Sequence, residues 1–127
     1  MQAFVQYLLE RELVPEPVGR RLAQRHSVRE PIGMIAVSHG LISPTEIDII
    51  LDRQRATQEK FGEAAVALGM LTPEQVDILI KLQEFRSSAE IAEALALSGT
   101  LTIEDAARYL GAFLVRDREL AAIMEDQ

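Results

Sequence analysis

Apolar residues in the middle of the chain recur at the three- and four-residue spacing of an amphipathic helix, and the pattern occurs twice. The first copy spans residues 31–54 and the second spans residues 60–83, at an offset of 29 positions. Each copy holds two apolar stripes separated by a short corner with a glycine, Gly40 in the first and Gly69 in the second. This spacing predicts two helices joined by a tight turn in each copy.

Specific residue types mark the corner and the start of the second helix in each copy. A glycine that follows an apolar helical stripe commonly adopts the left-handed conformation that ends a helix. A hydroxyl residue followed three positions later by glutamate or glutamine is typical of a capping box. The pairs that fit this pattern are Ser43 with Glu46 and Thr72 with Gln75.

Weaker copies of the pattern flank the duplicated segment, at residues 4–26 and 91–113. They keep the apolar stripes but differ at the corner and at the last position. Glu12 replaces a corner glycine, and His26 and Phe113 replace the glutamine with which each central copy ends. A unit of this size cannot bury its own apolar face, so such repeats are expected to stack on one another.

We therefore predict an all-α fold, with four helix-turn-helix repeats stacked into one compact domain over residues 1–113. The repeats are expected at residues 4–26, 31–54, 60–83 and 91–113. Short linkers are expected at residues 55–59 and 84–90, and a pair of serines in the second linker is a candidate helix cap. Residues 114–127, charged with alternating sign, are expected to form a C-terminal helix or a tether.

Each of the two central copies closes in a glutamine, Gln54 or Gln83, where the helical period calls for an apolar side chain. A buried amide without a hydrogen-bond partner costs roughly 1–3 kcal/mol. Two interpretations follow from this misfit. Either each amide bonds to nearby backbone at the end of its helix, or it contacts a group from outside the fold.

Composition and charge narrow the range of functions. The chain of 127 residues has no cysteine and two well-separated histidines, so we expect neither a thiolate nucleophile nor a metal site. Residues 1–60 balance 8 basic against 8 acidic side chains, whereas residues 61–127 hold 5 against 12, for a net charge of −7. Non-specific nucleic-acid binding depends on neutralising phosphates, so no DNA or RNA partner is expected.

Several catalytic and cofactor-binding signatures are absent from the sequence. There is no G-x-x-x-x-G-K-[ST] or G-x-G-x-x-G loop and no G-x-S-x-G elbow, so we expect no enzyme and no cofactor. The longest apolar run, residues 64–71, is too short to cross a bilayer, and no basic leader is evident at the N-terminus. We therefore expect a cytoplasmic protein without membrane insertion.

The duplicated segment resembles the MshEN-type N-terminal domain of type II secretion and type IV pilus assembly ATPases, which carries tandem 24-residue motifs. In that family the motif opens with Arg-Leu-Gly, continues through a glycine followed by two apolar residues, and closes in glutamine. The likeness covers residues 31–83, with degenerate copies at residues 4–26 and 91–113. Some members bind cyclic di-GMP through these motifs, so the resemblance implies a cyclic di-GMP site here.

The resemblance implies ligand-binding roles for seven residues of this chain. They are Ile32, Gly33, Gln54, Lys60, Phe61, Gly62 and Gln83. The opening arginine of the family motif is replaced by Pro31 in the first copy and by Lys60 in the second, and Arg29 is a candidate phosphate contact in its place. Gly33 and Gly62 are expected either to bring bare backbone close to a ligand or to allow close helix packing.

On this basis we expect a non-catalytic regulatory binding module. Its candidate ligand is cyclic di-GMP, its setting is pilus, secretion or motility signalling, and its protein partner is a secretion or pilus ATPase or another signalling protein. The alternative is a protein–protein interaction adapter of the same fold in which the nucleotide site has decayed.

Overall fold

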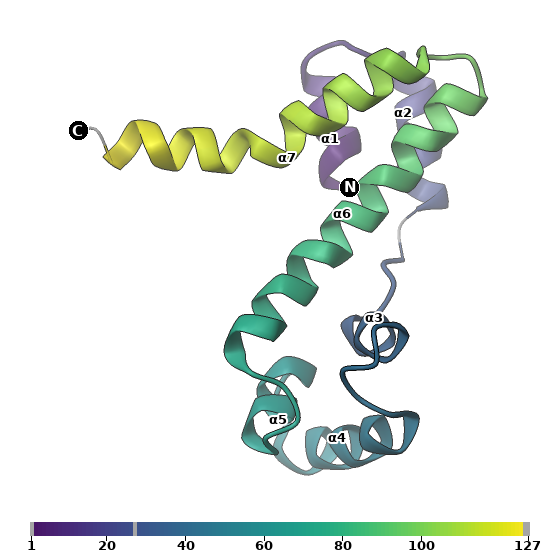
Figure 1. The fold of residues 1–127 in the computed structure, drawn as a ribbon. Helices are drawn as coiled ribbons and strands as arrows, with labels where there is room; N and C mark the ends of the chain where they lie inside the picture. Colours follow the sequence, from purple (N-terminus) through teal and green to yellow (C-terminus); the bar gives the residue numbers. More distant parts are fainter. Residues whose placement is uncertain (1, 27, 126–127) are drawn as a thin grey trace. The chain divides into compact units, whose positions relative to one another are not determined.

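The computed structural model describes residues 2–26 and 28–125, and the regular structure within these ranges is entirely helical (Figure 1). The predicted all-α class is therefore confirmed. The helices are α1 (Ala3–Glu10), α2 (Glu16–Arg25), α3 (Ile32–Ser38), α4 (Pro44–Thr57), α5 (Phe61–Ala67), α6 (Pro73–Leu97) and α7 (Ile103–Glu125).

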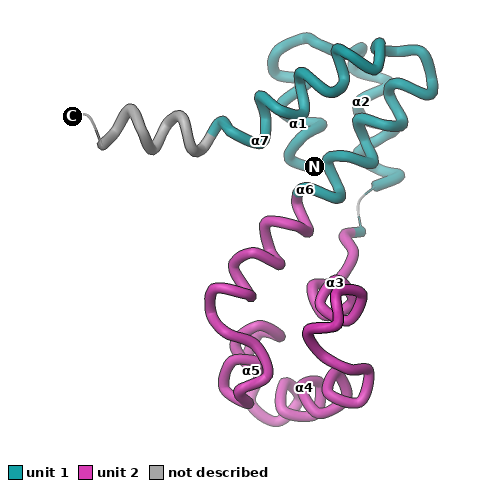
Figure 2. The backbone as a smooth tube through the Cα atoms, viewed as in Figure 1, with its two compact units in different colours: residues 1–28, 85–127 teal, residues 29–84 magenta. Residues whose placement is uncertain are grey.

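The chain forms two compact units rather than the single domain that we expected (Figure 2). One unit combines residues 1–28 with residues 85–127, and the other consists of residues 29–84. The central pair of predicted repeats thus forms one unit and the outer pair forms the other. The physical reason is that each pair closes its own hydrophobic core, so four repeats need not share one.

The core of residues 29–84 is itself duplicated. Its eight buried apolar residues are Ile35, Ala36, Ile42, Ile50, Ala64, Ala65, Leu71 and Leu79. The last four are the first four shifted by 29 positions, so each copy supplies the same four positions to the core. The apolar stripes of the two copies therefore bury each other, as expected for repeats that are too small to be stable alone.

The outer unit has a core built around aromatic rings. The rings of Phe4 and Phe113 lie 5.1 Å apart, and Tyr7 meets Phe113 edge-on at 5.4 Å. Phe113 occupies the position of the closing glutamine and is almost fully buried, at 1% exposure. In this repeat the closing position therefore contributes packing, which aromatic pairs reinforce by about 0.5–1.5 kcal/mol.

Left-handed residues mark all the predicted corners. Gly40, Gly69 and Gly99 have φ of 72°, 73° and 77°, and Glu12 has φ of 55°. At the first glycine corner, the Gly40 amide donates to Val37 at 3.0 Å and the next amide donates five residues back at 3.0 Å. This pair of bonds satisfies the last carbonyls of the helix, which is why α3 ends there.

The capping boxes are confirmed in both central copies. The Ser43 hydroxyl accepts a hydrogen bond from the Glu46 amide at 3.1 Å, and the Glu46 carboxylate accepts one from the Ser43 amide at 2.9 Å. Thr72 and Gln75 make the same two bonds at 3.1 and 2.9 Å. These contacts satisfy amides that have no partner within the helix and so set the starts of α4 and α6.

The linker predicted at residues 84–90 is wrong, because α6 continues through it from Pro73 to Leu97. This segment contains neither glycine nor proline, so nothing in it interrupts helical hydrogen bonding. Ser87 does not cap a helix but accepts a bond from the buried Gln2 amide at 3.1 Å, and Ser88 is fully buried.

Two other boundaries differ from the sequence-based prediction. Helix α4 continues to Thr57 and ends at Gln58, which is left-handed at φ 62°, so the first linker is shorter than predicted. Helix α7 runs without a break past residue 114, so the expected C-terminal helix is a continuation of α7 as far as Glu125. The part of that prediction that concerns residues 126–127 lies outside the described residues.

Candidate functional site

The two opening glycines lie where helices pack closely. A Cβ added to Gly33 would lie 2.8 Å from Phe61 Cζ and 2.9 Å from Ile47 Cδ1. A Cβ added to Gly62 would lie 2.6 Å from the nearest methyl carbon of Val76, which is the equivalent of Ile47 in the second copy. Both glycines are buried, and protein side chains cover the face that a Cβ would occupy. Of the two expected roles, close helix packing is therefore present, and backbone contact with a ligand stays a prediction.

The residues beside these glycines belong largely to the fold. Ile32 and Phe61 are partly buried and pack against the core of residues 29–84. Phe61 reaches from the start of the second copy to Gly33 at the start of the first. The structure therefore brings the two openings together through this ring.

The positively charged candidates lie at the surface. Lys60 is the residue before α5, as Pro31 is before α3, and neither side chain caps its helix. Lys60 and Arg29 are both exposed. Two cations thus stand next to the two opening positions, within the same unit.

The closing glutamine of the second copy bonds to the start of the first. Gln83 Nε2 donates to the backbone carbonyl of Glu30 at 2.9 Å. Glu30 immediately precedes the opening position of the first copy, 53 residues away in sequence. The interpretation of Gln83 as an amide at a helix end bonded to nearby backbone is wrong, because Gln83 lies inside α6 and its partner carbonyl belongs to a distant segment.

The closing glutamine of the first copy lies in an open depression. This hollow of about 340 Å³ is lined by Leu51, Gln54, Arg55, Gln58 and Glu59. Within the described ranges, the Gln54 side chain has no hydrogen-bond partner. The two amides are therefore unequal, because one is occupied by a carbonyl and the other is open.

Despite this inequality, the two ends share one feature. Glu59 precedes the opening of the second copy as Glu30 precedes that of the first. Gln54 lines a hollow together with Glu59, and Gln83 bonds to Glu30. Each closing glutamine therefore lies beside the glutamate that comes before an opening position, and the two copies meet head to tail.

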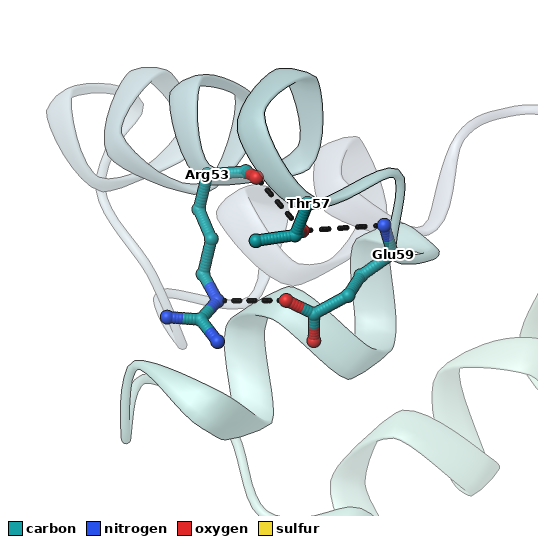
Figure 3. Close-up of polar contacts among 3 residues, drawn as sticks. All are labelled: Arg53, Thr57 and Glu59. Atoms are coloured by element: carbon teal, nitrogen blue, oxygen red, sulfur yellow. Dashed lines mark hydrogen bonds and ion pairs between the residues drawn. The ribbon is translucent and has the colours of Figure 1, made fainter.

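A polar cluster holds Glu59 in place (Figure 3). Arg53 Nε donates to Glu59 Oε1 at 3.0 Å, and Thr57 Oγ1 accepts from the Glu59 amide at 3.2 Å while donating to the Arg53 carbonyl at 2.9 Å. The side chains of Arg53 and Glu59 are 38% and 25% exposed. Sequence analysis missed this cluster, although Arg53 stands where the second copy has Leu82 and so breaks the apolar pattern.

A second, apolar hollow of about 210 Å³ lies elsewhere in the same unit. It is lined by His39, Leu41, Gln75, Ile78, Leu79 and Leu82. Ile78 is 56% exposed, and its equivalent in the first copy, Ile49, is 44% exposed. The sequence analysis did not identify this surface either. The available signal was an aspartate followed by an isoleucine, which occurs at equivalent positions of both copies and ends in Ile49 and Ile78.

The described residues contain no group of three or more histidine, aspartate or glutamate side chains arranged to hold a metal ion. No helix in the described part of the chain combines the length and apolar character that crossing a bilayer requires. The candidate site consists of amides, carboxylates and cations next to apolar side chains.

Comparison with known proteins does not assign the chain to a family. The chain matches no protein-family model, no curated protein and no solved structure.

Proposed function

We propose that this protein is a non-catalytic regulatory binding module whose residues 29–84 receive cyclic di-GMP. The observation that carries the proposal is the head-to-tail closure of two like copies, in which each closing glutamine lies beside the glutamate before an opening position. A ligand with two like halves is matched by a receptor with two like halves. Support also comes from the resemblance to the MshEN-type tandem motifs over residues 31–83.

The groups needed to hold such a ligand lie in one unit. Gln54 and Gln83 carry amides that suit the hydrogen-bonding edge of a base, and Lys60 and Arg29 carry exposed charges that suit phosphates. Both N–H groups of Gln54 are available to a ligand, whereas one N–H of Gln83 is already bonded to the Glu30 carbonyl. We therefore propose that the ligand engages the Gln54 half first.

Cellular context follows from the same resemblance. We propose that the module is cytoplasmic and passes its ligand state to a secretion or pilus ATPase or to another signalling protein. We propose that such a partner binds the apolar hollow between His39 and Leu82, which Ile78 also lines.

Titration calorimetry of the full chain with cyclic di-GMP tests the proposal. Micromolar or tighter binding that is lost when Gln54→Ala and Gln83→Ala are combined supports it. Unchanged binding in the double variant contradicts the proposed half-sites. The absence of heat at high micromolar ligand contradicts the receptor function itself.

The second candidate is a protein–protein interaction adapter in which the nucleotide site has decayed. The observation that favours it is the exposed apolar hollow, together with the loss of both opening arginines to Pro31 and Lys60. Apolar surface of this kind marks interaction sites. Ile78→Glu places a charge in the hollow and is expected to abolish partner capture measured without nucleotide, whereas Ile80→Glu, on an exposed residue outside the hollow, serves as its control.

A further inference from the structure

We infer that Glu59 is a specificity-determining residue that selects guanine at the Gln54 half-site, an inference that rests on the proposed function and extends it. Glu59 lies in the spacer between the two copies, outside the residues that the family resemblance assigns to the ligand. It lines the same hollow as Gln54, and the hollow also holds an apolar side chain, Leu51.

The chemistry of guanine explains the pairing of an amide with a carboxylate. The hydrogen-bonding edge of guanine presents one acceptor, O6, beside two donors, N1–H and N2–H. A glutamine amide donates to O6, and a carboxylate accepts from both donors at once. Adenine presents an acceptor at N1, which a carboxylate repels, so the combination of Gln54 with Glu59 favours guanine.

The geometry around Glu59 suits this role. The Glu59 side chain is 25% exposed, and its carboxylate is oriented by Arg53, which donates to Oε1. Figure 3 shows the other carboxylate oxygen turned away from this bond. The Glu59 backbone is held by Thr57, whose hydroxyl accepts a hydrogen bond from the Glu59 amide at 3.2 Å. A carboxylate held in this way is preorganised, so less conformational entropy is lost on binding.

The equivalent glutamine of the second copy already has a partner within the protein. Glu30 holds the position equivalent to Glu59, and its carbonyl already accepts the Gln83 amide. Glu59 lines a hollow with Gln54, whose amide groups are all available to a base. Glu59 is accordingly the residue whose substitution tests the inference.

The experiment compares cyclic di-GMP with its inosine analogue, which lacks only the 2-amino groups, by calorimetry on the full chain. The wild-type protein is expected to bind the analogue about tenfold more weakly, since a charge-assisted hydrogen bond contributes about that factor. Glu59→Gln is expected to weaken cyclic di-GMP binding about 10- to 100-fold and to remove the preference between the two ligands. The loss of preference is the double-mutant-cycle signature of a direct contact.

Arg53→Gln is the matched control, because it breaks the same ion pair but keeps the carboxylate. It is expected to retain the preference for cyclic di-GMP. Glu63→Gln, on an exposed residue of α5, is expected to change neither affinity nor preference. Circular dichroism of each variant confirms that the helices are intact.

Each outcome decides a separate question. Equal binding of the two ligands by the wild-type protein, or a preference that survives in Glu59→Gln, overturns the role of Glu59 and leaves the receptor function standing. Failure of the wild-type protein to bind either dinucleotide overturns the receptor function and the inference with it.

Discussion

The side-chain amide of Gln83 donates a 2.9 Å hydrogen bond to the backbone carbonyl of Glu30, which joins the end of the second copy to the start of the first. Gln54, the equivalent glutamine of the first copy, has no such partner within the described residues. The two glutamines can therefore be compared within one protein, because the Gln83 amide is bonded to the fold and the Gln54 amide is not.

The first prediction concerns these two glutamines. Gln83→Ala is expected to lower the free energy of unfolding by about 1 kcal/mol, the usual net contribution of one hydrogen bond. Gln54→Ala is expected to change it by less than about 0.5 kcal/mol, as surface substitutions usually do. Urea denaturation followed by circular dichroism measures both. Equal losses in the two variants would show that the Glu30 contact does not stabilise the ligand-free protein.

The second prediction concerns the buried opening glycines. Gly33→Ala is expected to destabilise the protein by about 1–3 kcal/mol, because the added methyl meets Phe61 and Ile47 at less than 3 Å. Gly111→Ala, in α7, meets nothing within 4 Å and is expected to stabilise by about 0.5–1 kcal/mol through helix propensity. Thermal unfolding of the two variants should shift in opposite directions. A neutral Gly33→Ala would contradict the close packing of the two openings.

The third prediction concerns a left-handed residue that is not glycine. Glu12 has φ of 55°, a conformation that costs an L-residue roughly 1–2 kcal/mol. Glu12→Gly is expected to stabilise the protein by about 0.5–1 kcal/mol, because relief of this strain exceeds the added entropy of the unfolded chain. Gly40→Ala, the reverse change at an equivalent corner, is expected to destabilise by about 1 kcal/mol. Melting temperatures that move the same way in both variants would contradict the equivalence of the corners.

The fourth prediction concerns two neighbouring serines of α6. Ser88 is fully buried, and its hydroxyl has no hydrogen-bond partner in the described structure. Ser88→Ala is therefore expected to be neutral or to stabilise by about 1 kcal/mol. Ser87→Ala is expected to destabilise by about 1 kcal/mol, since the buried Gln2 amide loses its acceptor. Guanidinium denaturation distinguishes the two, and a destabilised Ser88→Ala would show that its hydroxyl has a partner.

The local features of the fold were predictable from sequence because their causes lie within a few residues. The corners at Gly40 and Gly69 and the capping box of Ser43 with Glu46 are formed by adjacent backbone and side-chain groups. The period of 29 residues also placed the core positions, as the pair Ile35 and Ala64 illustrates. Such signals need no knowledge of distant contacts.

The division into two units and the length of α6 were not predictable in this way. Residues 84–90 separate two apolar stripes and resemble a linker, yet they contain no residue that stops a helix. Packing between segments far apart in sequence decides which repeats share a core. The 29-residue period does not predict that packing. The contacts of Gln83 with Glu30 and of Arg53 with Glu59 were missed because single polar pairs leave no periodic trace.

The stoichiometry of cyclic di-GMP binding, measured by titration calorimetry on the full chain, tests the central claim most directly. Two like half-sites that share one ligand predict one cyclic dinucleotide per chain, with affinity reduced by Gln54→Ala and reduced further when Gln83→Ala is added. Two ligands bound per chain, or no heat of binding at high micromolar ligand, would contradict the claim that residues 29–84 form a single receptor site.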